Sequence, residues 1–240
     1  MFNASVNLKS KLNSTLVAVV AVLAAAALPA AAQAKITEIG DVTQPGTPSC
    51  PSNPCLAMTR TTGYQAKVGP TRGTMIAPVS GRIVAFTLAL GATNPKQTSF
   101  FQSRFGGEPQ ARLTILRTGA HLFDRVVAQS EVFTLTDYLG QTVQFPLAQS
   151  LPVAKGQLVA LTVPTWAPVL AVGLPRDTSW RASRKGSCND ISTQSLQTAQ
   201  STIGSQAQYR CLYATARLTY SATLIPTPTP NKKPATTKSK

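Results

Sequence analysis

The sequence is poor in the side chains that acid–base catalysis and metal binding use most. Its 240 residues include one histidine and eight acidic residues. General acid–base catalysis and metal sites draw largely on histidine and carboxylate groups, so a catalytic or metal site of several residues is not expected. We therefore expect no metal ion, no cofactor and no enzymatic activity.

Charged residues are scarce, and the two signs are unequal. They make up 13% of the chain, with 23 Lys and Arg against 8 Asp and Glu, whereas hydrophobic residues make up 43%. Disordered chains combine low apolar content with high net charge, so this composition predicts a folded, basic protein.

Long hydrophobic runs are confined to the N-terminus. The apolar stretch 16–32 follows two lysines and precedes a small-x-small pattern at 32–34, which is typical of a secretory signal peptide over residues 1–34. A retained membrane anchor is the alternative, but this Ala-rich run, interrupted by Pro29, is short for a span of about 20 residues. We expect a secreted, extracellular protein without stable membrane insertion after cleavage, and its association with the cell envelope stays open.

Both ends of the remaining chain lack core residues. Residues 35–55 predict a linker that contains a Cys50/Cys55 loop, and the Pro-, Thr- and Lys-rich stretch 226–240 predicts a disordered tail. The tail suits attachment to an anionic surface, and it equally suits a role in solubility alone. Residues 56–225 remain as the folded domain.

Within 56–225, apolar residues recur with a period of two, and Gly or Pro interrupts them at short intervals, which predicts an antiparallel β-sandwich. In 217–224 every second residue is apolar, so one face is expected in the core and the other, with Arg217, in solvent. The similar segments 81–88 and 156–163 predict central strands that are covered on both faces. Residues 190–204 are rich in Ser, Thr and Gln and predict a loop. Further strands are expected at 110–116, 132–135, 142–145, 158–163 and 169–172.

Four cysteines in an exported chain predict two disulfides, with three possible pairings. We favour Cys50–Cys55, because the prolines between them allow the chain to turn back. The remaining pair is then Cys188–Cys211, which would join the long polar loop to the final strand. A zinc site is the alternative, but the spacing lacks two closely spaced ligand pairs.

Aromatic side chains provide the candidate ligand-binding residues. Trp166 lies between two prolines and Trp180 follows a polar turn, and tryptophan rings in loops are suited to stacking on sugars. Arg176, Arg181 and Arg184 lie nearby in sequence and could donate hydrogen bonds. The alternative is that both indoles close the ends of the core.

The arginines are spread over the domain, which predicts a positive surface that suits an anionic polymer. No nucleic-acid-binding motif is present, so no specific nucleic acid is expected. The sequence does not indicate an oligomeric state.

The stretch 145–161 resembles a recurring element of jelly-roll domains: a short strand, V-x-x-G, then a long apolar strand. Together with the leader and the cysteine pairs, the chain is similar to uncharacterised secreted β-sandwich proteins of bacteria. The resemblance implies a jelly-roll sandwich and assigns no site residues.

These observations favour a secreted binding or surface-interaction module for cell-envelope or environmental polysaccharide. One alternative is a structural envelope protein with no small-molecule ligand. A carboxylate-dependent hydrolase is another, and its candidate pairs would be Glu108 with Glu131 or Asp124 with Asp137.

Overall fold

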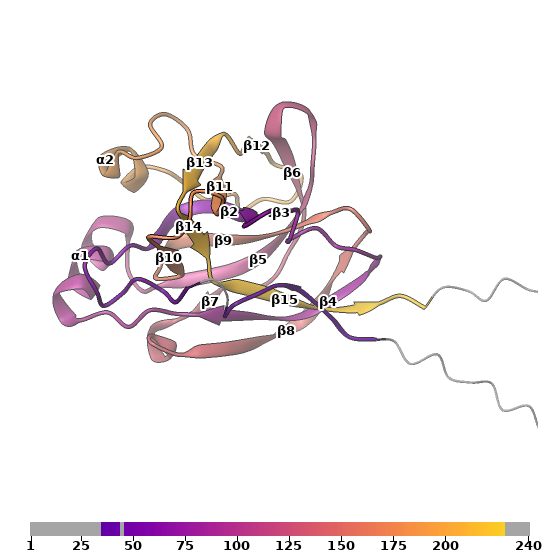
Figure 1. Ribbon diagram of the computed structural model, residues 1–240, viewed down its shortest axis with the longest axis horizontal. Helices are drawn as coiled ribbons and strands as arrows, with labels where there is room; N and C mark the ends of the chain where they lie inside the picture. Colours follow the sequence, from indigo (N-terminus) through magenta and orange to yellow (C-terminus); the bar gives the residue numbers. More distant parts are fainter. Residues whose placement is uncertain (1–34, 44–45, 229–240) are drawn as a thin grey trace, which may run out of the picture. The chain divides into compact units, whose positions relative to one another are not determined.

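The computed structural model describes residues 35–43 and 46–228, drawn in colour in Figure 1. The predicted signal peptide over 1–34 and most of the predicted tail 226–240, from residue 229 onward, lie outside the described residues, so these parts remain predictions. The tail prediction is wrong for Pro226, which is the last residue of the final strand and pairs with Gly81. The predicted linker contributes a strand, because Thr37–Gly40 pairs with the last strand of the domain. The helices and strands are β1 (Thr37–Gly40), β2 (Met58–Val68), β3 (Thr71–Arg72), β4 (Gly81–Ala89), α1 (Pro95–Phe105), β5 (Gln110–Arg117), η1 (Ala120–Leu122), β6 (Phe123–Gln129), β7 (Phe133–Thr134), η2 (Thr136–Tyr138), β8 (Thr142–Val153), β9 (Leu158–Ala167), β10 (Leu170–Val172), β11 (Ser179–Ala182), α2 (Ile191–Ser195), β12 (Gln206–Gln208), β13 (Cys211–Ala214), β14 (Ala216–Leu218) and β15 (Tyr220–Pro226).

The strand order confirms the predicted antiparallel sandwich of jelly-roll type. One sheet has the order β1-β15-β4-β8, and the other contains β6-β5-β9-β2 as consecutive neighbours. Following the chain through these eight strands, each step crosses to the opposite sheet except the β5–β6 hairpin. Two interlocked Greek keys of this kind define a jelly roll.

The core lies between the facing surfaces of the two sheets. Phe86 of β4 and Phe145 of β8 stack with ring centroids 5.3 Å apart, and they belong to the same apolar cluster as Leu113, Ile115 and Leu161 of the second sheet. Residues 158–163 of β9 are all buried, which confirms a strand covered on both faces. β4 is also a central strand, between β15 and β8, but its outer face is only partly covered, because Arg82 is exposed.

A long insertion between β9 and β15 covers the outer face of the second sheet. It adds β11 and β13 beside β2, and β12 beside β6. In Figure 1, α2, β11, β12 and β13 of this segment lie above β2, β9 and β5, while β15, β4 and β8 lie below them. The predicted loop at 190–204 is largely irregular, as expected, apart from the five-residue helix α2.

Beneath the insertion, a row of buried hydroxyl groups crosses the second sheet. The Thr162 hydroxyl lies 2.8 Å from that of Thr62 and 2.6 Å from that of Thr114. Gln129 extends the row, because its amide donates to Thr114 Oγ1 and to the backbone oxygen of Gln200 in the insertion. Hydroxyls that bond to one another can be buried at little cost, since none is left unsatisfied.

The two predicted disulfides, Cys50–Cys55 and Cys188–Cys211, are both confirmed, and the described residues contain no free cysteine. Cys188–Cys211 joins the irregular part of the insertion to β13. Disulfides of this kind indicate an oxidising environment, such as the extracellular space. Among the described residues, no helix combines the length and hydropathy needed to cross a membrane.

Candidate functional site

The structure buries Trp166, the first predicted sugar-stacking residue. Its side chain at the end of β9 is 0% exposed, and its ring stacks on Phe101 of α1 with centroids 4.9 Å apart. The indole N–H donates to the backbone oxygen of Gly107 at 3.0 Å. The prediction of sugar stacking is therefore wrong for Trp166, because neither ring face is open to a ligand.

Trp180 is also unavailable for stacking. It is 3% exposed and stacks on Tyr213, its neighbour across the β11–β13 pair, with centroids 4.4 Å apart. Arg184 is 3% exposed and donates to the Tyr213 hydroxyl and to Thr59. Both side chains stabilise the insertion from inside, so the alternative that the indoles close the core is the one the structure supports.

The other two predicted arginines do not join a shared site with the indoles. Arg176 is exposed in the loop before β11. Arg181 is half-buried and donates to the backbone oxygen of Tyr209. With the two tryptophans enclosed in different places, the five predicted ligand-binding residues form no common binding surface.

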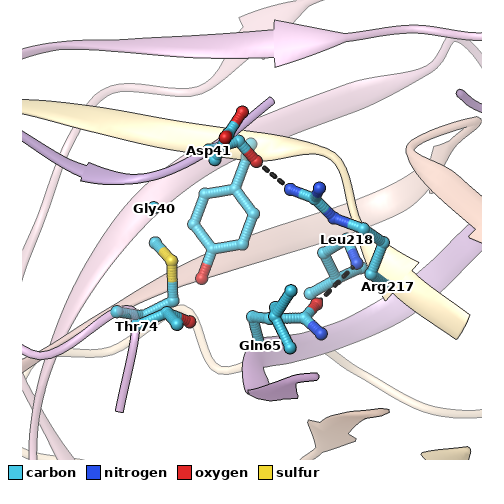
Figure 2. A pocket seen from close by; sticks show the side chains of 9 residues that line it. Gly40, Asp41, Gln65, Thr74, Arg217 and Leu218 are labelled. Carbon is cyan, nitrogen blue, oxygen red and sulfur yellow. Dashed lines mark hydrogen bonds between the residues drawn. The ribbon is translucent and has the colours of Figure 1, made fainter. Parts of the chain in front are cut away.

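A pocket elsewhere in the fold has the features of a ligand site. It lies where β1 ends, beside the start of β15, the end of β2 and the loop after β3, and its volume is about 490 Å³ (Figure 2). Ligand pockets in proteins range over roughly 300–1,000 Å³. Its lining residues are Gly40, Asp41, Gln65, Val68, Thr74, Met75, Arg217, Leu218 and Tyr220.

Arg217 is the charged group in the wall of this pocket, and it is buried. The sequence pattern predicts this side chain in solvent, but its exposed fraction is only 2%. The prediction is wrong because the outer face of the last strands is covered: Arg217 Nη2 donates to the backbone oxygen of Asp41, and Ser221 donates to Glu38 of β1. Leu218, Tyr220, Ala222 and Leu224 are in the core, as expected.

The guanidinium of Arg217 is incompletely satisfied. Nε and Nη1 are buried and have no hydrogen-bond partner. Burial lowers the pKa of Arg217, while the negative charge of Asp41 opposes that shift. A buried donor without a partner costs about 1–3 kcal/mol, and more when it is charged, so an acceptor that entered the pocket would recover a substantial penalty.

The neighbouring polar groups hold the pocket in shape. The Gln65 amide donates to the backbone oxygens of Lys67 and Ser179, and its own oxygen accepts from Leu218 N at 2.9 Å. Figure 2 shows Gln65 beside Arg217, with Thr74 on the other side of the pocket. Thr74 Oγ1 is a second buried polar atom without a hydrogen-bond partner.

Of the carboxylates considered for a hydrolase, Asp124 is 2% exposed, and Glu131 accepts from the backbone N–H of Ala148 at 2.7 Å. Neither lines the Arg217 pocket. The described part of the chain contains no group of three or more His, Cys, Asp and Glu side chains placed to hold a metal ion.

Asp124 is expected to destabilise the folded protein at neutral pH. Burial raises its pKa, opposed by the Gly119 N–H and the charge of Arg181, and its Oδ2 has no hydrogen-bond partner. A carboxyl with a raised pKa binds its proton more tightly in the folded state, so its contribution to stability decreases as the pH rises from its ordinary value of 3.8 through the folded value.

Asp124→Asn should therefore be more stable than the wild type at pH 7, and the difference should shrink towards pH 4. Urea denaturation at both pH values measures this. Asp137→Asn, at an exposed site, is the control and should show no such gap. A variant that is no more stable than the wild type at pH 7 would contradict the expectation.

Sequence reasoning missed the pocket because its residues come from four separate segments of the chain. Arg217 alternates with apolar neighbours exactly as an outward residue would. Only the cover provided by the segment around Asp41 distinguishes it from the exposed arginines, and no local pattern encodes that cover.

Comparisons with known proteins add no assignment. No protein-family model, no curated protein and no solved structure matches this chain. Functional conclusions therefore depend on the chain's own residues.

Proposed function

We propose that this protein is an exported binding module that holds an acidic group of its ligand in the Arg217 pocket. The observation that carries the proposal is the buried guanidinium, whose Nε and Nη1 lack partners in the wall of a cavity of about 490 Å³. Hydrogen bonds from an ionised donor to an anion are about twice as strong as neutral ones, so an acid group is the acceptor this wall favours.

Binding rather than catalysis is supported by the chemistry of the lining. Burial raises the pKa of the Tyr220 phenol, which stays neutral and donates to the backbone oxygen of Val159 at 2.8 Å. The Asp41 carboxylate accepts hydrogen bonds from Thr43. General-base catalysis needs a titratable group within reach of the substrate, and the pocket is better equipped to hold an anion than to move a proton.

The ligand class expected from the sequence, cell-envelope or environmental polysaccharide, is one source of such an acidic group, because some of its members carry carboxylates. Exposed basic residues on several strands and in one connection would add long-range attraction for such polymers. They include Arg72, Arg82, Arg117 and Arg210. Export is supported by the features of residues 1–34 and by the two disulfides.

Thermal unfolding in the presence of acids tests the proposal. A panel of oligouronate, alkyl carboxylate and inorganic phosphate is added at constant ionic strength, which removes general charge screening as a variable. A bound ligand raises the Tm, so at least one acid should raise that of the wild type. Arg217→Met should lose the shift.

Arg117→Met is the matched control, because it removes one positive charge from an exposed position on β5 outside the pocket. It should respond as the wild type does. If no acid shifts the wild type, the structural envelope protein without a ligand becomes the better account. If Arg217→Met keeps the shift, the acid binds outside the pocket and the proposal is wrong.

A further inference from the structure

We propose that the Arg217 pocket binds a small organic acid that carries one negative charge on an apolar body, such as a medium-chain carboxylate. The inference rests on the proposed function and specifies its ligand. It follows from three properties of the pocket: its charge, the state of its polar groups and its apolar surface.

The charged residues of the pocket suit a ligand that carries a single negative charge. Arg217 is the one basic residue among those lining the pocket, and the acidic residue Asp41 lies beside it. The backbone oxygen of Asp41 accepts from Nη2, and the negative charge of its side chain acts on the guanidinium. The site is poorly solvated, and Asp41 already neutralises part of the positive charge of Arg217. A ligand with two negative charges would therefore leave negative charge in the pocket without a counter-ion.

Most polar groups of the pocket are already hydrogen-bonded within the protein, so few remain to bind the hydroxyl groups of a ligand. Both functional atoms of the Gln65 amide are engaged by backbone groups, and the Tyr220 hydroxyl is committed to Val159. Among the described residues that line the pocket, Thr74 and Arg217 carry the buried polar atoms without a hydrogen-bond partner, namely Thr74 Oγ1 and Arg217 Nε and Nη1. A sugar ring would lose several hydrogen bonds to water and regain few, which disfavours it here.

The rest of the surface is apolar. Met75, Leu218 and Tyr220 are each 1% exposed, and Val68 is half-buried. Gly40 allows this packing, because a Cβ at its position would lie 2.6 Å from Met75 Sδ. Apolar walls with a few placed polar groups are typical of small-molecule sites, and burying a methylene group gains about 0.8 kcal/mol.

Isothermal titration calorimetry of the full mature chain, at constant ionic strength, tests the inference. The probes are octanoate, its neutral analogue octanamide, octyl phosphate and glucuronate, which differ in charge or in the polarity of the body. Octanoate should bind, and the other three should bind at least about tenfold more weakly, the factor that one charge-assisted hydrogen bond supplies.

Two variants locate the binding. Arg217→Met should weaken octanoate binding roughly 10- to 100-fold while leaving the weak octanamide binding unchanged. Val68→Phe fills the pocket and retains the charge, and it should abolish binding of octanoate. Arg117→Met is the charge-matched control and should bind as the wild type does.

The outcomes separate this inference from the proposed function. Arg217-dependent binding of octyl phosphate or glucuronate without octanoate would overturn the inference and leave the proposed function in place. Failure of every acid would overturn both. Equal binding of octanamide and octanoate would overturn the inference, because it would show that the negative charge of the ligand does not contribute to binding. If Arg217→Met does not fold by circular dichroism, Val68→Phe decides: a folded variant that still binds octanoate overturns the inference.

Discussion

Replacing Trp166 with alanine is expected to destabilise the domain by about 3–5 kcal/mol, the range for truncating a large buried aromatic side chain. The indole is 0% exposed, stacks on Phe101 and donates to Gly107. Its loss would leave a cavity between β9 and α1 and an unpaired backbone oxygen. Urea denaturation followed by far-ultraviolet circular dichroism measures the change in free energy of unfolding.

Phe100→Ala is the matched control for this variant. Phe100 lies on α1, next to Phe101, but its side chain is 47% exposed. Its removal should therefore lower the free energy of unfolding much less. A loss below about 1 kcal/mol for Trp166→Ala would contradict the buried position, since such small effects are typical of surface substitutions. The expected instability also means that weaker polysaccharide binding by this variant would not identify a stacking residue.

Removing the Cys188–Cys211 disulfide by a double serine substitution is expected to cost about 3 kcal/mol. In the chain-entropy model, a cross-link restricts the unfolded chain more when it closes a longer loop, and these cysteines are 23 residues apart. The bond fixes the segment that covers the threonine row of the second sheet. Denaturant titration without reductant, compared with the wild type, provides the measurement.

The second disulfide gives an internal comparison. Cys50 and Cys55 are 5 residues apart, so the same model assigns their double serine variant a loss of about 2 kcal/mol. The order of the two losses is the decisive result. A larger loss at Cys50–Cys55 would show that chain entropy is not the main contribution, and that packing around the proline turn is.

Helix α1 is not among the predicted elements, although residues at its start are typical of a helix N-terminus. Asn94 caps the helix, Pro95 occupies its first turn, and Gln97 completes a capping box with Asn94. These residue types at this spacing are a recognised helix start. Two phenylalanines of this helix, Phe101 and Phe105, are buried and pack with Trp166.

Sequence alone predicted the antiparallel sandwich, and among three possible cysteine pairings it favoured the one that the structure confirms. Alternation with a period of two is a local property, because successive side chains of a strand point to opposite faces. It predicts that Leu218 and Tyr220 lie in the core, and they do. The prolines between Cys50 and Cys55 allow a local turn, and this pair forms, as does the remaining pair, Cys188–Cys211.

Only the tertiary structure decided which strands are buried on their polar face as well as on their apolar face. Alternation separates the two sides of a strand, but it does not specify what packs against the polar side. Arg217 is buried by contact with Asp41, 176 residues earlier in the chain, and Trp180 by the cross-strand ring of Tyr213. The candidate site follows from such distant contacts: a charged residue of ordinary strand pattern becomes a binding group once another segment removes it from water.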